Sequence, residues 1–167
     1  MDGNIWTYFV AALIPMIIGF IWYNPKVFGN TWMTAAKVTQ EDVESGNMPL
    51  IFGLSYVLSL ILVFMMNYFV HHEMQIAGTV FMDPELAVAP DSELGVMMTD
   101  FLDSISARYN TFGHGLLHGF FIALFLVLPV MATNAMFERK GFKYIAVNWG
   151  YWAVTIMLIG GFMSQFY

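Results

Sequence analysis

Four long stretches of the sequence contain no Asp, Glu, Lys or Arg, and this feature limits the fold more than any other. The stretches cover residues 3–25, 45–72, 109–137 and 144–167. Each supplies the ~20 apolar residues that a helix needs to cross a hydrocarbon layer of ~30 Å. Buried helices of soluble proteins seldom stay uncharged over such a length. The sequence therefore predicts an all-α bundle of four transmembrane helices, at about residues 4–24, 49–72, 112–137 and 144–166.

The composition agrees with a single integral membrane domain covering residues 1–167, because 59% of the residues are hydrophobic and 11% are charged. The one long connection, residues 73–111, is too short to fold alone. The net charge of -6 is not gathered into a basic stripe, which excludes nucleic acid as a partner. Cysteine is absent, so disulfides, thiolate catalysis and cysteine-based metal sites are excluded as well.

The basic residues predict which loops face the cytoplasm. Lysine and arginine lie mainly in or beside the loops 25–48 and 138–143, at positions 26, 37, 139, 140 and 143. Cytoplasmic loops of membrane proteins collect these two residue types. We therefore expect an N-out/C-out topology in a bacterial inner membrane, with the termini and the loop 73–111 on the extracytoplasmic side.

Local signals predict further detail in the loops and in the first span. Pro15 lies in the middle of the first span and is expected to kink it. Thr39 and Asp42 have the spacing of a capping box, which predicts a short helix. In the long loop, apolar residues recur at helical spacing and predict an amphipathic interfacial helix, which we expect to cap the bundle. These apolar residues are Leu94, Met97, Met98, Phe101, Leu102 and Ile105.

Small residues recur along the third and fourth predicted spans. Gly115, Gly119 and Ala123 fall on one stripe of the third span, and Asn134 lies close to its continuation. The fourth span repeats the pattern with Gly150, Gly160, Gly161 and Ser164. Because small residues let helix backbones approach closely in lipid, we expect these two spans to pair as an antiparallel hairpin. The pattern leaves open whether the same faces also join a second copy of the chain.

Four histidines lie at the outer end of the predicted bundle. His71 and His72 end the second span, and His114 and His118 begin the third span one helical turn apart. Imidazole suits Zn, Cu, Fe and Ni, so these residues are candidate ligands of a divalent metal or a haem. The competing interpretation is that they are packing and interface histidines, since the glutamate of the HExxH metalloprotease motif is absent.

The sequence contains no nucleophile elbow, P-loop or dinucleotide-binding glycine pattern, so we predict no catalytic residues. The leading hypothesis is a non-enzymatic helix-packing subunit of a homo-oligomer, or an accessory subunit of a larger membrane complex. The second hypothesis is an outer-leaflet binding module for a lipid, quinone, haem or metal. A small transporter or membrane enzyme is the third. The expected partners are the lipid bilayer and either the chain itself or other membrane subunits.

Several motifs resemble an uncharacterised bacterial membrane family, domain of unknown function 1761. The resemblance covers residues 18–32 with the sequence IGFIWYNPKVFGNTW, residues 53–56, and positions from His114 through Trp152. It implies four helices and a location in the membrane. It supplies no reaction, ligand or catalytic residue.

Overall fold

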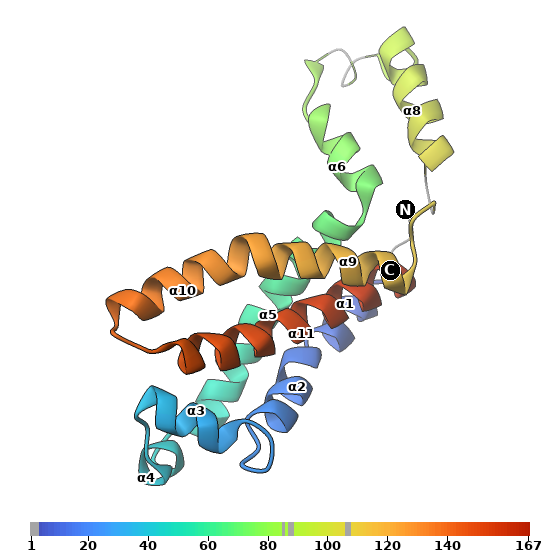
Figure 1. Ribbon diagram of the computed structural model, residues 1–167. Coiled ribbons are helices and arrows are strands. Elements are labelled where there is room, and N and C mark those ends of the chain that lie inside the picture. Colours follow the sequence, from blue (N-terminus) through green and yellow to red (C-terminus); the bar gives the residue numbers. More distant parts are fainter. Residues whose placement is uncertain (1–3, 85, 87–88, 106–107) are drawn as a thin grey trace.

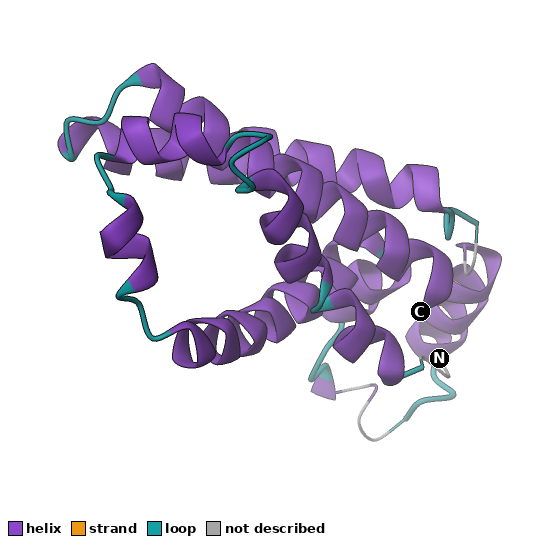
Figure 2. Cartoon of the chain, turned by 90° about the horizontal axis from the view of Figure 1, so that it is seen from below, coloured by secondary structure: helices purple, strands orange, loops and turns teal. Residues whose placement is uncertain are grey.

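The computed structural model describes residues 4–84, 86, 89–105 and 108–167, and its fold is all-α (Figure 2). Residues 1–3 of the predicted domain lie outside this description. So do residues 85, 87–88 and 106–107 of the predicted outer loop.

Within the described residues, three helical segments are long and apolar enough to cross a membrane, judged by length and composition. They are α5 (Met48–Val70), the continuous segment Phe112–Phe137, and α11 (Phe142–Phe166). The segment Phe112–Phe137 consists of α9 (Phe112–Ile122), a π-helical turn (Ala123–Val127) and α10 (Leu128–Phe137). It lies antiparallel beside α11, and α5 crosses behind them (Figure 1).

The N-terminal apolar helix, Trp6–Trp22, is shorter than the other three and is divided in two. Its parts are α1 (Trp6–Ala11) and α2 (Ile14–Trp22), and Pro15 lies in the first turn of α2. Proline has no N–H group and its ring clashes with the preceding turn. The chain tightens at this point, because the Leu13 N–H bonds to the Val10 carbonyl at 3.1 Å, three residues back. The helix is therefore interrupted just before Pro15, at the point where the sequence predicts a kink.

The first connection contains two short helices, α3 (Gly29–Ala36) and α4 (Gln40–Glu44). The predicted capping box begins α4, and the hydrogen bonds from Thr39 hold the pKa of Asp42 below its ordinary value. Helix α3 was not predicted. Its C-terminus lies against the third connection, where Lys140 Nζ donates a hydrogen bond to the Ala36 carbonyl at 2.6 Å.

The long connection contains α6 (His72–Thr79) and α8 (Glu93–Ile105), and α8 covers the range of the predicted amphipathic helix. The two helices lie side by side and project from the end of the bundle (Figure 1). The expectation that this helix caps the bundle is therefore wrong. The reason is α6, which was not predicted: it continues the chain outward beyond α5 and carries α8 with it.

The packed core lies between α1, α5 and α11, and its largest buried apolar side chains are Val63, Met66, Val70, Ile156, Ile159 and Met163. Large apolar side chains cover much of the outer surface as well, and Phe20 is 80% exposed and Phe125 71% exposed. Soluble monomers rarely expose large contiguous apolar patches. The outer surface is therefore suited to lipid.

Candidate metal centre

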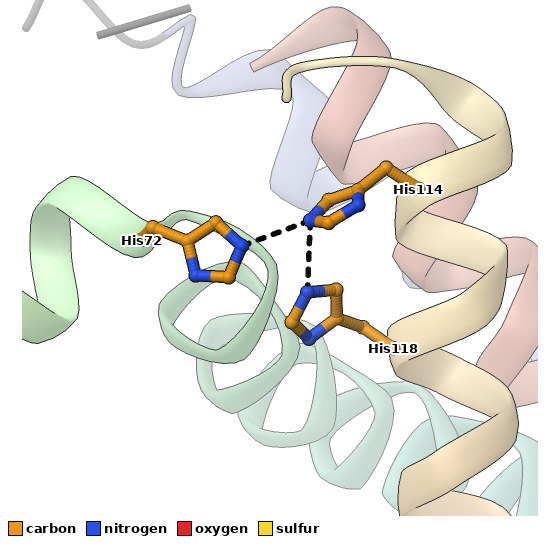
Figure 3. A group of neighbouring side chains, drawn as sticks. All are labelled: His72, His114 and His118. Atoms are coloured by element: carbon orange, nitrogen blue, oxygen red, sulfur yellow. Dashed lines mark hydrogen bonds between the residues drawn. The ribbon is translucent and has the colours of Figure 1, made fainter. Parts of the chain in front are cut away.

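Three of the four histidines come together at the junction of α6 and α9. The Nε2 atom of His114 lies 2.9 Å from the Nε2 atom of His72 and 2.9 Å from that of His118. The ligand atoms of the three residues all lie within 4.8 Å of one another, and each side chain is partly buried. Figure 3 shows the rings directing these nitrogens toward one another, with the other nitrogen of each ring pointing elsewhere.

The start of α9 positions two of these side chains. Thr111 is the N-cap residue, and its hydroxyl oxygen accepts a hydrogen bond from the His114 N–H at 3.3 Å. The i, i+4 spacing then places His118 one turn further along the same face as His114. The third histidine must come from another element, and it comes from α6.

A break in the helix positions His72. The backbone of His71 is extended (φ -105°, ψ 104°), so α5 ends at Val70 and α6 begins at His72 in a new direction. The His71 N–H and its ring Nδ1 lie 3.3 and 3.0 Å from the Asn67 carbonyl oxygen. The Asn67 carbonyl therefore accepts the last backbone hydrogen bond of α5 and also contacts the His71 ring.

His71 is therefore separate from the other three histidines. Its side chain is 2% exposed, and its ring packs against that of Tyr167 at a centroid distance of 5.4 Å. Glu73, which follows His72, is also outside the converging set. Within the described part of the chain, this set consists of His72, His114 and His118.

Tyr109 forms one wall of the cluster. Its ring stacks on His114 at a centroid distance of 5.2 Å and meets the edge of His72 at 5.7 Å. The carbonyl of Tyr109 accepts a hydrogen bond from the Ser164 hydroxyl at 3.4 Å, which ties this wall to α11. No sequence pattern singles out Tyr109, because its position depends on how the loop before α9 returns to the bundle.

The glycines of α9 and α11 lie where the two helices touch. A Cβ at Gly115 would lie 2.7 Å from Ser164 Cβ and would also overlap the Gly160 backbone. A Cβ at Gly119 would lie 2.6 Å from Met157 Cα. The close approach therefore fixes α9, and with it His114 and His118, against α11.

Two other predicted packing glycines contact aromatic rings. A Cβ at Gly161 would lie 2.9 Å from the Phe112 ring, and one at Gly150 would lie 2.9 Å from the Trp22 ring. Gly150 therefore packs against the N-terminal apolar helix and not against α9.

The π-helical turn separates Ala123 from Asn134. Ala123 is fully buried, and its carbonyl accepts hydrogen bonds from the Leu128 N–H and, at 2.8 Å, from Trp149 Nε1. A π-helical turn holds about one extra residue, which rotates the following helix by roughly 100° relative to a continuous α-helix. Asn134 is accordingly exposed, and the predicted stripe does not extend to it.

The family model described as "Protein of unknown function (DUF1761)" matches residues 6–164, so the chain belongs to this family. This confirms the resemblance found in the sequence. No curated protein and no solved structure matches the chain.

Proposed function

We propose that this DUF1761 protein is an integral membrane protein that binds one divalent transition-metal ion through His72, His114 and His118. The observation that supports the proposal is the convergence of three Nε2 atoms, with His114 Nε2 at 2.9 Å from both of its neighbours.

Hydrogen bonding alone does not account for this arrangement. A neutral imidazole carries a proton on one nitrogen and a lone pair on the other, so each nitrogen makes one good hydrogen bond in the ring plane. The Nε2 atom of His114 has two partners at the same distance. A metal ion removes the conflict, because each ring then directs its own lone pair at the ion.

Two of the three Nε2 pairs need only a small adjustment to fit a metal ion, and the third pair lies within 4.8 Å. Zn–N bonds of about 2.0–2.1 Å place the nitrogens of a tetrahedral site about 3.4 Å apart. The two close Nε2 pairs are at 2.9 Å, so each would have to separate by roughly 0.5 Å. Small rotations of the imidazole side chains supply such a movement.

The ligand set indicates which ions would bind. Imidazole nitrogen suits Zn, Cu, Ni and Fe, whereas Ca²⁺ and Mg²⁺ prefer carboxylate and carbonyl oxygens. Three neutral ligands leave one position of a tetrahedral ion open to water or to a further ligand. A haem fits less well, since its iron takes axial ligands on opposite faces of the macrocycle and these nitrogens meet at one point.

The membrane arrangement belongs to the same proposal. Four spans with N-out/C-out topology in a bacterial inner membrane would place the histidine cluster at the extracytoplasmic boundary. The positive charges at the opposite end of the bundle support this orientation, because Lys26 and Lys37 precede α5, Lys140 lies between α10 and α11, and Lys143 is in the first turn of α11.

A packing subunit or homo-oligomer gains less support. That hypothesis rested on glycine stripes, and Gly115, Gly119 and Gly160 contact the neighbouring helix of the same chain. These faces are therefore already covered and do not offer a surface to a second copy.

The test is metal binding by protein purified with an affinity tag that contains no histidine. The protein is stripped with a chelator and titrated with Zn²⁺, Cu²⁺ and Ni²⁺, and the bound metal is counted by mass spectrometry. We expect one equivalent. Replacing His72, His114 or His118 singly by Asn should lower the affinity by more than about 100-fold, beyond the usual effect of losing an outer-shell partner.

The control variant is Glu73→Gln, which changes a charge next to His72 without touching the converging nitrogens, and it should bind as the wild type does. The Tm of each metal-free variant shows whether the bundle is intact. Retention of a full equivalent by all three folded histidine variants would contradict the proposal.

A further inference from the structure

A groove of about 740 Å³ lies at the opposite end of the molecule from the histidine cluster, between α3 and the first turn of α11. Its walls include residues of α3 on one side and of the start of α11 on the other. The lining residues are Asn30, Thr31, Thr34, Ala35, Gly141, Phe142, Lys143 and Tyr144.

The polar wall of the groove favours an anion. Lys143 lines it, and Lys140 lies beside it, with Nζ 5.5 Å from the ring centroid of the lining residue Tyr144. No acidic residue is among those that line it. The acidic residues of the first connection lie on α4 instead, at Glu41, Asp42 and Glu44.

The first turn of α11 adds unpaired donors to the same wall. The N-cap residue is Gly141, and no side chain caps this turn. The first N–H groups of a helix lack intrahelical partners and carry partial positive charge. A Cβ at Gly141 would have no atom within 4 Å, so the space beside this turn is open.

The groove also has an apolar edge. Phe142 lines it and is 81% exposed. A lysine near the end of a span keeps its charged head at the level of the lipid headgroups, and an exposed phenylalanine ring suits the hydrocarbon beside it. A ligand that satisfies both walls has a negative head and an apolar tail.

We infer that this groove binds the headgroup of an anionic phospholipid. The phosphate lies at the first turn of α11 and beside Lys143, and the acyl chains leave along Phe142. The inference is independent of the metal site, because no residue is shared.

The decisive variant is Gly141→Asp. Gly141 has the extended backbone of an N-cap residue (φ -85°, ψ 173°), and aspartate is among the best N-cap residues. The new carboxylate would therefore satisfy the first turn of α11 and occupy the phosphate position. A purely structural role for this turn predicts equal or higher stability and unchanged lipid binding, whereas a lipid site predicts that lipid binding is lost.

The measurement is the Tm of delipidated protein in detergent, titrated with phosphatidylglycerol, phosphatidylcholine or inorganic phosphate. We expect the Tm of the wild type to rise most with phosphatidylglycerol and not to respond to inorganic phosphate. Gly141→Asp should abolish that rise without lowering the lipid-free Tm. Lys143→Gln should weaken phosphatidylglycerol binding about fivefold. Lys26 does not line the groove, so the control variant Lys26→Gln should bind phosphatidylglycerol as the wild type does.

Two results would overturn the inference. One is an equal response of the wild type and Gly141→Asp to phosphatidylglycerol. The other is a full response to inorganic phosphate alone, which would show a phosphate site without a lipid.

Discussion

The contact between α9 and α11 makes a quantitative prediction about Gly119. A Cβ at this position would lie 2.6 Å from Met157 Cα, 2.7 Å from the Ile156 carbonyl oxygen and 2.8 Å from the Met157 nitrogen. Carbon atoms pack best at about 3.5–4.0 Å, so Gly119→Ala requires the two backbones to separate by roughly 1 Å. All three contacts are with backbone atoms, so no flexible side chain can move away instead.

We expect Gly119→Ala to destabilise the protein by about 1–3 kcal/mol, the usual range for overpacking. The matched control is Gly53→Ala in α5, where the added Cβ meets no atom within 4 Å. There the substitution removes a flexible glycine from a helix and should stabilise by about 0.5–1 kcal/mol. The two Gly→Ala variants should therefore have opposite signs.

The assay is reversible unfolding in mixed detergent micelles, with metal binding measured on the same samples. A separation of roughly 1 Å exceeds the ~0.2 Å tolerance of metal–ligand distances, so Gly119→Ala should also weaken metal binding. Gly53→Ala should leave metal binding unchanged. A Gly119→Ala protein as stable as Gly53→Ala would refute the packing argument.

Three further predictions concern separate features. Metal retention should fall as the pH is lowered, because protonation removes the imidazole lone pair that binds the ion, and bound metal counted after dialysis at each pH measures this. Tyr151→Phe removes the 2.9 Å hydrogen bond to the Pro15 carbonyl and should destabilise the protein by about 0.6 kcal/mol in the same unfolding assay. An unchanged stability would contradict the role of this bond. A cysteine at Ser92 should react with an impermeant reagent added from the periplasmic side, and labelling from the cytoplasm alone would invert the proposed topology.

The positions of the long helices could be predicted because they follow from composition. Charge is too unfavourable in hydrocarbon to be scattered through a span, so the uncharged runs match the helices to within a few residues. The capping box at Thr39 was equally predictable, since the two residues that make it are three apart in the sequence. Both signals are local.

The features that the sequence did not predict depend on contacts between segments that are distant in the sequence. Helix α3 begins at Gly29, a residue that usually ends helices, and its last carbonyl binds Lys140 from the third connection. The π-helical turn precedes Pro129, and although proline predicts a disturbance, it does not indicate an added residue. His72 meets His114 only because the helix breaks at His71, and residue spacing in the sequence does not predict this break.

The break between α5 and α6 gives two adjacent histidines separate evolutionary constraints. Position 71 holds the last turn of α5, and position 72 faces the converging nitrogens of α9. A homologue could then replace His71 with another residue that completes the turn and still keep His72. Another homologue could replace His72 and keep His71. Substitutions at the two positions should therefore vary independently across the family, while position 72 should covary with positions 114 and 118.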